Sequence, residues 1–511
     1  MDNELNQHFI NQVKKCKNKK IIFWGASIFL EEFLEKYPLD KSNILGIVDK
    51  NPQRWGEFLG KYEIFNPEKI NELKPNCIII SIKNLDFKRN AEICKSIKEQ
   101  FPKIKLLPNV LVKKSLKNNL IKYYWLFKFI DIFIPKNKKK IVFLSYPDYT
   151  DNSKEYYEYL KNHHNNEYEL IWLYENYTVF NTSNVENKYF IGTLIGIWHL
   201  LTSKYIVFTH TRAASDAFHK KRHVFLQLWH GMPLKTLGFN EKNINAFHFE
   251  KYKEYGQNAY FFVSSDIFKL SMISCFLMKP DQVFITGQAK TDCILTDRNR
   301  EKIEKLIEPQ KYDKVIIYAP TYKEALRNNR RDIDKSFENI FYCDDFDEQN
   351  FCKILEEKNI LFLIKPHPFD ERFYRKHIKS GNLNHPNIKV FFDNDMKTNN
   401  LYFYDFFKFA DLMISDFSSI AIDWLISKKP VIFLNSTSEE YAKKRGFILE
   451  DNYETLMPGA KVSSYKALLD AINDTFTVDS WKEKRLNTLP LLYKYFDNNS
   501  SERIYEIMKN L

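Results

Sequence analysis

Short apolar runs alternate with amphipathic stretches over residues 20–110, a pattern typical of strands and helices that follow one another. KIIFWGAS predicts a strand that ends in a turn, IFLEEFLEKY a helix, and NILGIVDKN and NCIIISIKN two further strands. A strand, a glycine-containing turn, a helix and a strand ending in Asp49 predict a Rossmann-type βαβ unit, with Asp49 where a ribose-binding acid would lie. WGASIFL has one glycine where the nucleotide-binding fingerprint has three. Nucleotide binding and a purely structural βαβ unit therefore both stay open.

The pattern changes over residues 113–140, where KKSLKNNLIKYYWLFKFIDIFIPKNKKK combines aromatic and basic residues. Lysines flanking Tyr, Trp and Phe suit an interfacial helix on an anionic membrane leaflet. An interdomain helix that packs on its neighbour, followed by a solvated linker, explains the same pattern. The sequence leaves both interpretations open.

Strands and helices alternate again from residue 139, with a fresh start at KVIIYAPTY, and residues 481–511 predict helices. This alternation predicts two successive doubly wound α/β domains after the N-terminal one. The predicted parts are a Rossmann-like domain over 1–112, a basic and aromatic helical linker over 113–138, α/β domains over 139–305 and 306–480, and C-terminal helices over 481–511 that pack back on them.

Composition narrows the class of protein without naming a function. Hydrophobic residues make up 44% of the 511 residues and aromatic residues 16%, which excludes a disordered chain. The net charge of +12 favours anionic partners, but it is not gathered into one basic stripe with base-stacking aromatics, so nucleic acid is not predicted as a partner. Seven cysteines without a C-x-x-C pair argue against a disulfide framework and a zinc ribbon.

Hydropathy predicts a cytoplasmic protein. The first 20 residues are polar, which argues against a cleaved secretion signal. The longest apolar stretch, Tyr189–Leu201, has 13 residues, whereas a membrane-spanning helix needs about 18. We expect a soluble or peripheral protein on the inner face of the cell membrane.

Five segments share one feature, an apolar run that stops at a polar, Gly or Pro-containing turn. The carboxyl ends of strands in open α/β sheets are where ligands bind. The first segment, VFLQLWHGMPLKTLG, places Trp229, His230, Gly231 and Lys235 at such an exit. A neutral imidazole there could accept a proton from a hydroxyl, while Gly231 admits close approach and Lys235 attracts an anion. An ordinary buried histidine is the alternative.

The next two segments carry weaker signals. VFITGQAKTD places Gly287, Lys290 and Asp292 after a strand, which also fits a solvated strand-to-helix turn. KVIIYAPTYKE places Pro320 and Thr321 after a buried strand. Small residues and a hydroxyl suit a closely approaching phosphate or ribose, and they suit an ordinary turn equally well.

The fourth segment, ILFLIKPHPFD, holds Lys365 and His367 between prolines that stiffen the loop. A fixed histidine beside a lysine predicts a diphosphate clamp, against the alternative of a satisfied loop histidine.

The fifth segment, KFADLMISDFSSIAIDWLISKKPVIFL, is the most informative. A strand stops at Asp416, and Ser418 and Ser419 open a helix that contains Asp423. Free N–H groups and hydroxyls at a helix start favour an anion, whereas simple N-capping by Ser418 is the structural alternative. Asp423, one turn inside, could reach a ribose or polyol hydroxyl or face water.

Taken in order, WHGMPLK, TGQAKTD, YAPTY, KPHP and SDFSSIAIDWLISKKPVIFL resemble the CDP-glycerol glycerophosphotransferase family of teichoic-acid and capsular polyol-phosphate synthesis, from about residue 139 to the end. The resemblance implies a GT-B architecture, in which two Rossmann-like halves face a cleft and the C-terminal half holds CDP. It implies that His230 is the family's essential histidine near the acceptor, proposed as the base, and that His367 is the second, at the diphosphate. The implied donor-binding positions are Ser418, Ser419 and Asp423, with Asp416 and Lys365 adjoining them.

The chain departs from the family pattern at several positions. Met232 stands where the family often has Thr, Ala289–Thr291 where it has Pro-Arg-Asn, and Lys365 where it has Arg. Arg and Lys bind phosphate differently, so the resemblance leaves the polyol and the roles of Lys290 and Lys365 open.

The predicted reaction is attack by an acceptor hydroxyl on the polyol-bearing phosphorus of CDP-glycerol or CDP-ribitol, with release of CMP. We expect no obligatory cofactor or metal, and Mg²⁺ is not predicted. The expected acceptor is a polyol-phosphate, capsular or lipid-linked glycan, with an anionic membrane surface as a further partner. A nucleotide-sugar glycosyltransferase on the same fold is the alternative, followed by a non-enzymatic protein that binds an anionic polymer or membrane.

Overall fold

The structure is a computed structural model that divides into two compact units. The first comprises Met1–Tyr149, Glu169–Lys204 and Arg212–Arg222, and the second comprises Thr150–Tyr168, Tyr205–Thr211 and His223–Leu511. The structure describes residues 2–16, 18–37, 43–82, 87–107, 124–175, 179–180, 183–210, 222–241, 252–253, 256–321, 339–367, 370–393, 396, 401–435 and 446–511.

The first unit begins with a six-stranded sheet in the order β3-β4-β2-β1-β5-β6, which is parallel except for the β3–β4 hairpin. Its strands are β1 (Ile21–Trp24), β2 (Ile44–Val48), β3 (Phe58–Leu59), β4 (Tyr62–Phe65), β5 (Cys77–Ile80) and β6 (Lys105–Leu107). Its helices are α1 (Asp2–Lys15), α2 (Ile28–Lys36), α3 (Ile70–Leu73) and α4 (Phe87–Gln100).

Both faces of this sheet are covered, and its central strands β1 and β5 are apolar and buried at every position. Phe23 of β1 packs with Phe9 of α1 and Phe33 of α2 in one core. Trp24, the next residue of β1, packs with Ile97 of α4 in a second core on the opposite face. Successive side chains of a strand point to opposite faces, so continuous apolar runs are expected in a sheet that is buried on both sides.

The first unit also contains β7 (Asn137–Phe143), β8 (Glu169–Tyr174) and β9 (Lys188–Phe190), parallel neighbours in that order. The helix α9 (Leu194–Thr202) contacts β7 and β9. A short helix, α6 (Tyr124–Asp131), precedes β7 inside the predicted linker, and residues 108–123 of that linker lie outside the described residues. In the part of the chain that the structure describes, no helix is long and apolar enough to cross a bilayer.

The second unit contains β10 from Tyr205 onward and then three further parallel strands in sequence order. These strands are β10 (Ser203–Phe208), β11 (Val224–Gln227), β12 (Ala259–Val263) and β13 (Val283–Ile285). The accompanying helices are α7 (Asp151–His163), α12 (Asp266–Phe276), the 3₁₀ helix η6 (Ala289–Leu295) and α13 (Arg300–Ile307). Phe208 pairs with Gln227, so β10 and β11 end side by side.

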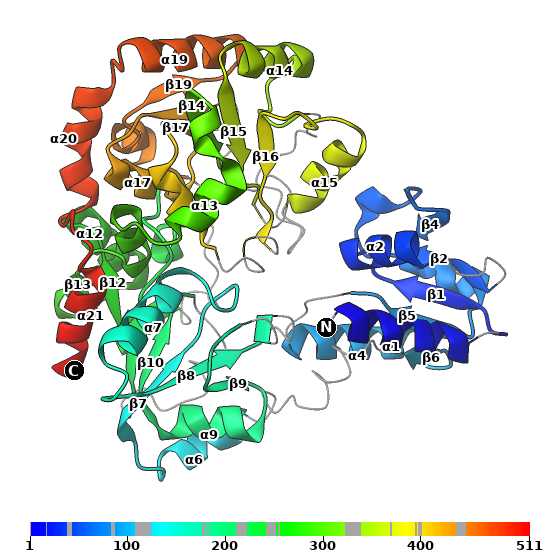
Figure 1. The fold of residues 1–511 in the computed structure, drawn as a ribbon. Helices are drawn as coiled ribbons and strands as arrows, with labels where there is room; N and C mark the ends of the chain where they lie inside the picture. Colours follow the sequence, from blue (N-terminus) through cyan, green and yellow to red (C-terminus); the bar gives the residue numbers. More distant parts are fainter. Residues whose placement is uncertain are drawn as a thin grey trace. The chain divides into compact units, whose positions relative to one another are not determined.

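The second unit also holds a six-stranded parallel sheet in the order β16-β15-β14-β17-β18-β19 (Figure 1). Its strands are β14 (Lys314–Tyr318), β15 (Ile360–Ile364), β16 (Ile388–Val390), β17 (Leu412–Ser415), β18 (Val431–Leu434) and β19 (Ala460–Val462). Its helices are α14 (Glu348–Glu357), α15 (Glu371–Lys379), α17 (Ser419–Trp424) and α19 (Tyr465–Thr477). The order in which strands are added reverses between β14 and β17, because β15 and β16 lie on one side of this pair and β18 and β19 on the other. In open α/β sheets, such a reversal opens a crevice at the carboxyl edge.

Two helices end the chain, α20 (Lys482–Leu492) and α21 (Ser500–Lys509). The first contacts α12 and the second contacts α7 and η6. Tyr505 of α21 stacks on His164 with ring centroids 3.8 Å apart, and Tyr156 donates a hydrogen bond to Met508 Sδ over 3.4 Å. The prediction of an α/β protein with parallel sheets is confirmed.

Candidate functional site

One carboxylate joins the carboxyl ends of β14 and β17. Asp416, just after β17, accepts hydrogen bonds from the Thr321 backbone N–H at 3.1 Å and from the Thr321 hydroxyl at 2.6 Å. Both residues are buried. The carboxyl ends of the two central strands are therefore fastened together, with Pro320 preceding the contact and Ser418 and Ser419 following it.

His230 lies in the loop that leaves β11, and its tautomer is set by one hydrogen bond. Its Nδ1 lies 3.1 Å from the Thr209 carbonyl oxygen, which can only accept, so Nδ1 carries the proton. Nε2 then carries the lone pair. Burial lowers the pKa of His230 below its usual 6.5, an effect only partly opposed by Asp151 and the Thr209 carbonyl. The imidazole is therefore a neutral base near pH 7.

Two aromatic rings stack on this imidazole. His210, just after β10, stacks on it with centroids 4.0 Å apart and an interplanar angle of 9°, and Trp229 stacks at 4.6 Å. Trp229 is itself buried and also contacts Phe261 and Phe276, so it packs in the core. His210 was not predicted as a site residue from the sequence. Its signal was available, because His210 follows an apolar strand just as His230 does.

The His230 loop lies directly against the start of α17. Gly231 has φ +133°, and a Cβ built on it would lie 2.9 Å from Ser419 Cβ and Oγ, so this position requires glycine. Further along the loop, the Thr236 N–H donates to the Gly446 carbonyl and the Ile448 N–H to the Leu234 carbonyl. His230 and the serine-started helix are thus brought together. Ser418 is the N-cap of α17, but its side chain makes no capping hydrogen bond.

A buried lysine holds the His230 backbone in place. Lys290 Nζ donates to the His230 carbonyl over 2.8 Å and lies 3.0 Å from Asp423 Oδ2 and 3.5 Å from Asp151 Oδ1. Burial alone lowers the pKa of Lys290, but the two aspartates raise it above its usual value. The ammonium is therefore charged, and its contacts are to the protein itself.

Asp423 is fully buried in this network. It accepts hydrogen bonds from the hydroxyls of Tyr404 and Tyr493 and pairs with Lys290. In this arrangement its oxygens face protein groups, not solvent. Nearby, Asn152 donates to the carbonyls of Leu228 and Trp229 and accepts from the Lys290 N–H, which ties α7 and η6 to the His230 loop.

His367 lies at the exit of β15, next to β14 in the sheet. Burial, with a contribution from Lys365, lowers its pKa from 6.5 to about 4, so it is neutral near pH 7. The Lys365 ammonium lies 2.6 Å from Asp393 Oδ1. Lys235 and Asp416 both act electrostatically on His367, and Lys235 lies 5.1 Å from the ring centroid of Phe417. His367 thus lies within electrostatic range of Asp416 and Lys235, at the carboxyl edge of the sheet that also carries Ser418 and Ser419.

Gly287 and Asp292 lie against the C-terminal helix instead. A Cβ on Gly287 would lie 2.3 Å from Ser500 Oγ. Asp292 accepts hydrogen bonds from the backbone N–H groups of Ser500 and Ser501, so it caps α21 from 208 residues away in the chain. Both of these predicted site residues therefore contact α21.

Asp292 gives a prediction that separates capping from substrate binding. Burial raises its pKa from 3.8 to about 7, so the folded state holds a proton that the unfolded state loses. The stabilisation from this group is complete below about pH 3.8 and is lost as the pH rises through 7. We expect urea unfolding to show that Asp292→Asn removes this part of the pH dependence.

The matched substitution Asp292→Ala removes the cap, and we expect it to lower the free energy of unfolding by about 1–2 kcal/mol. The KM for a nucleotide donor should stay unchanged. A raised KM with unchanged stability would instead place Asp292 in a binding site.

Asp49, in the first unit, also makes its hydrogen bonds to backbone groups of the protein. Its Oδ2 accepts from the Ala26 N–H at 2.8 Å and its Oδ1 from the Asn51 N–H at 2.9 Å. Of the two interpretations left open for the N-terminal βαβ unit, this geometry favours the structural one.

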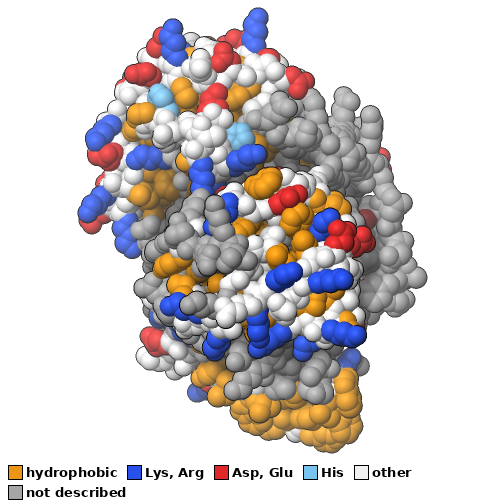
Figure 2. Space-filling view, turned by 90° about the vertical axis from the view of Figure 1, so that its right-hand side faces the viewer, with side chains coloured by type: hydrophobic (Ala, Val, Ile, Leu, Met, Phe, Trp, Pro, Cys, Tyr) orange, Lys and Arg blue, Asp and Glu red, His pale blue; other side chains and the backbone are white. Residues whose placement is uncertain are grey.

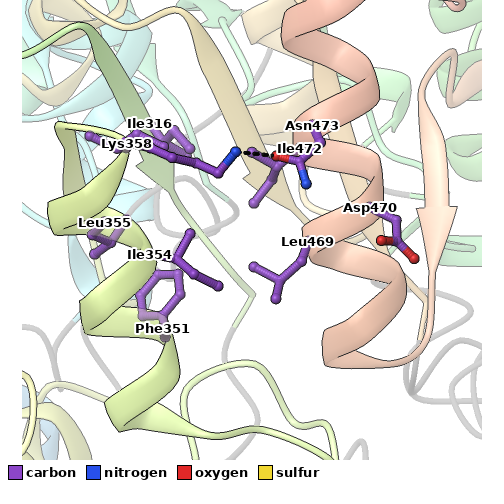
Figure 3. A pocket seen from close by; sticks show the side chains of 10 residues that line it. Ile316, Phe351, Ile354, Leu355, Lys358, Leu469, Asp470, Ile472 and Asn473 are labelled. Atoms are coloured by element: carbon purple, nitrogen blue, oxygen red, sulfur yellow. Dashed lines mark hydrogen bonds between the residues drawn. The ribbon is translucent and has the colours of Figure 1, made fainter.

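A pocket in the second unit lies away from these residues. It is lined by side chains of α14, α19 and the strands beneath them, including Phe351, Leu355 and Leu469, with Lys358 donating to Asn473 over 2.8 Å (Figure 3). None of the predicted site residues lines it. Among the residues that the structure describes, no group of three or more His, Cys, Asp or Glu side chains could hold a metal ion. That no metal is obligatory stays a prediction.

Two families match the chain. Residues 126–510 match the family described as CDP-Glycerol:Poly(glycerophosphate) glycerophosphotransferase. Residues 17–104 match the family described as C2185-like, N-terminal.

Curated relatives are similar to part of the chain. The chain is 27% identical to the teichoic acid ribitol-phosphate polymerase TarL of Staphylococcus aureus over 339 residues, 65% of this chain and 56% of that protein. It is 28% identical to TarK of the same organism, over 55% of this chain and 51% of TarK. The chain thus spans about half the length of these two relatives. It is 26% identical to the teichoic acid glycerol-phosphate primase of Bacillus subtilis, over 61% of this chain and 77% of the primase.

Among solved structures, the wall teichoic acid polymerase TagF is similar with a TM-score of 0.62 and 20% identity, over 83% of this chain and 97% of TagF. A histidine-to-asparagine variant of TagF soaked with CDPG gives a TM-score of 0.60 at 20% identity over the same shares. At this identity the likeness establishes a shared fold.

Proposed function

The chain belongs to the CDP-Glycerol:Poly(glycerophosphate) glycerophosphotransferase family, and on that premise we propose that it transfers a polyol phosphate from a CDP-polyol to a hydroxyl of a growing polymer, releasing CMP. The acceptor oxygen forms a bond to the polyol-bearing phosphorus, and the bond from that phosphorus to the CMP oxygen breaks. The acceptor proton passes to a base. The observation that carries the proposal is the neutral imidazole of His230, placed against the serine-started helix α17.

His230 is the proposed base. Its Nδ1 is engaged by Thr209, so the other nitrogen is the one that can accept a proton. The stacked His210 and Trp229 rings restrict rotation of the imidazole. A base held in one tautomer and one orientation avoids reorganisation when the acceptor hydroxyl attacks.

We place the donor diphosphate at the carboxyl edge of the sheet that contains β14 and β17. Support comes from the cations near this edge, Lys235 and Lys365, and from the hydroxyls of Ser418 and Ser419, which make no hydrogen bond inside the described residues. His367 contributes as a neutral hydrogen-bonding group, because its pKa of about 4 leaves it uncharged. A bound diphosphate would favour the protonated form and raise that pKa. This placement of the diphosphate fits a GT-B arrangement of two Rossmann-like halves.

From their positions in the sequence, Lys290 and Asp423 were predicted to bind the substrate. We propose a different role for both residues. Lys290 holds the carbonyl of His230, and Asp423 neutralises Lys290. We assign both as positioning residues. The polyol stays open between glycerol and ribitol, since curated relatives of both kinds are similar to the chain.

The proposed function is tested by comparing donors. Purified protein with membranes as the acceptor is incubated with CDP-glycerol, CDP-ribitol or a panel of UDP- and GDP-sugars, and released nucleotides are separated. We expect CMP from at least one CDP-polyol and no nucleoside diphosphate from the sugars. Release of UDP or GDP with no CMP would identify a nucleotide-sugar glycosyltransferase and overturn the proposal.

A further inference from the structure

The sheet at the start of the first unit carries exposed lysines along its amino edge, the edge at which its parallel strands begin. Two segments contribute them, one that leads from α1 into β1 and one that leads from α4 into β6. We call this surface the lysine cluster, and its members are Lys14, Lys15, Lys19, Lys20, Lys103 and Lys105, all of them exposed. Exposed charges of one sign that gather on one edge attract ligands of the opposite sign.

Strand pairing brings the two segments together. The strand β5 lies between β1 and β6, and its residue Cys77 is opposite Ile21 of β1 and Lys105 of β6. Just before β5, the Asn76 N–H donates to the Lys20 carbonyl over 2.8 Å, and the Asn76 carbonyl accepts from the Lys105 N–H over 3.2 Å. Neighbouring strands are about 5 Å apart, so the backbones of Lys20 and Lys105 lie about 10 Å apart. The two segments therefore form one surface.

The pKa of one buried thiol shows that charges from both segments lie close together. Burial raises the pKa of the Cys16 thiol from 9.0 to about 11, and the neighbouring Cys77 adds to this rise. The ammonium groups of Lys19 and Lys105 oppose it, because a nearby positive charge favours the thiolate. A lysine before β1 and a lysine of β6 thus both lie within electrostatic range of one side chain.

No carboxylate neutralises the lysine cluster within the part of the chain that the structure describes. Residues 11–20 and 100–107 contain no Asp or Glu. None of the six ammonium groups forms an ion pair with a described residue, and Glu99, in the last turn of α4, already pairs with Lys95 over 3.7 Å. Elsewhere on the surface, lysines and arginines lie among acidic side chains, as the upper part of Figure 2 shows. Repulsion within the cluster is therefore left for an anionic ligand to relieve.

The side chains of the cluster indicate which anion it suits. All six cations are lysines, which act as point charges on flexible stems, whereas arginine binds planar groups through a fixed fork. Phe101, the one aromatic residue of these two segments, is buried, so no ring is offered to a nucleic-acid base. Their described residues also include no large exposed apolar side chain that could insert into a bilayer. A flexible chain of singly charged phosphodiesters fits this chemistry.

We propose that the lysine cluster binds a polyol-phosphate polymer, at a surface separate from the site of transfer. The choice of this polymer rests on the proposed function, because the product of that reaction is a polyanion with one phosphodiester charge per repeat. A polymer held by the first unit stays tethered to the chain that extends it, which raises its effective concentration at the site of transfer. Its binding releases counterions and therefore weakens as salt is added.

The experiment measures fluorescence anisotropy of labelled glycerol phosphate and ribitol phosphate oligomers with the full-length protein over a range of salt concentrations. The test variant is Lys19→Gln/Lys20→Gln/Lys103→Gln/Lys105→Gln. It leaves Lys14 and Lys15 in place, because cations at the end of α1 also stabilise that helix. We expect the wild type to bind at least one oligomer and the variant to bind it about tenfold more weakly or worse. The slope of log K against log salt should become shallower by about 2–3.

A matched variant controls for net charge. Lys69→Gln/Lys95→Gln/Lys311→Gln/Lys353→Gln removes the same number of charges from lysines that pair with acidic neighbours, and it should leave oligomer binding nearly unchanged. Thermal unfolding checks that each variant is folded. The two half variants, Lys19→Gln/Lys20→Gln and Lys103→Gln/Lys105→Gln, should each show part of the loss if both segments contribute.

Equal oligomer binding by the wild type and the folded test variant would overturn the proposal. Single-stranded DNA of equal charge that binds more tightly through the same lysines would assign the cluster to nucleic acid. Binding to phosphatidylglycerol vesicles without oligomer binding would assign it to a bilayer, and either assignment overturns the proposal. Oligomer binding without CMP release from any CDP-polyol would leave this inference standing while the proposed function fails. CMP release without oligomer binding would do the reverse.

Discussion

His230→Ala is expected to lower kcat for CMP release from a CDP-polyol by roughly 10²–10⁴-fold, the usual contribution of a general base. The substitution removes the one nitrogen that can accept a proton, because Nδ1 is committed to Thr209. His230→Asn keeps a donor near the Nδ1 position and should be equally slow. Steady-state kinetics with saturating donor measure both.

The pH profile gives a second readout of the same assignment. Burial lowers the pKa of His230 below 6.5, so the base is lost only as the pH falls through that lowered value. We expect the acid limb of kcat to lie below pH 6.5 in the wild type. His163→Ala, at an exposed histidine of α7, is the control and should match the wild type. Wild-type turnover by folded His230→Ala would remove His230 from the mechanism.

Lys290→Met is expected to lower the free energy of unfolding by ~3–5 kcal/mol, because it leaves Asp423 charged, buried and without its cation. The hydroxyls of Tyr404 and Tyr493 stay bonded to that carboxylate but cannot neutralise it. Urea unfolding measures the loss. The double variant Lys290→Met/Asp423→Asn removes both charges and should recover much of the stability.

The same substitution should also change the chemistry of His230. Lys290 lowers the pKa of His230 by charge repulsion, so removing the lysine raises that pKa and moves the acid limb of kcat to higher pH. Lys290→Arg keeps the charge and should leave the limb near its original place. Lys353→Met, at a lysine that is 71% exposed, is the stability control and should cost less than about 0.5 kcal/mol. A loss below 1 kcal/mol for Lys290→Met would contradict the positioning role.

The apolar runs predicted the strands well because parallel strands covered on both faces are apolar throughout. KIIFWGAS contains β1, ILFLIKPHP contains β15, and the segment around DLMIS contains β17. The ends of the strands could also be predicted from the sequence, because a polar or glycine-containing turn follows each apolar run. For this reason the pattern placed His230, Thr321 and Asp416 at the ends of strands, as the structure does.

Partners from distant parts of the chain could not be predicted in the same way. Asp292 follows a strand and Asp423 lies one turn inside a helix that follows a strand, as binding residues would, yet one caps α21 and the other pairs with Lys290. His210 was passed over because its partner, His230, is brought beside it by the pairing of β10 with β11. Loop composition does not carry this information, because hydrogen-bond partners are set by how the sheets and helices pack.

By itself, the sequence determined the α/β layering, the edge where the polar residues lie and the excess of positive charge, since periodicity and composition act through local geometry and burial. Only the tertiary structure decided which polar groups are already satisfied by the protein. Among the described residues, it leaves the Nε2 side of His230 and the hydroxyl of Ser418 without a protein hydrogen bond, and it encloses Asp423. It also decided which face of α9 stays exposed, because a helix that is apolar on both sides gives no indication of which one packing will cover.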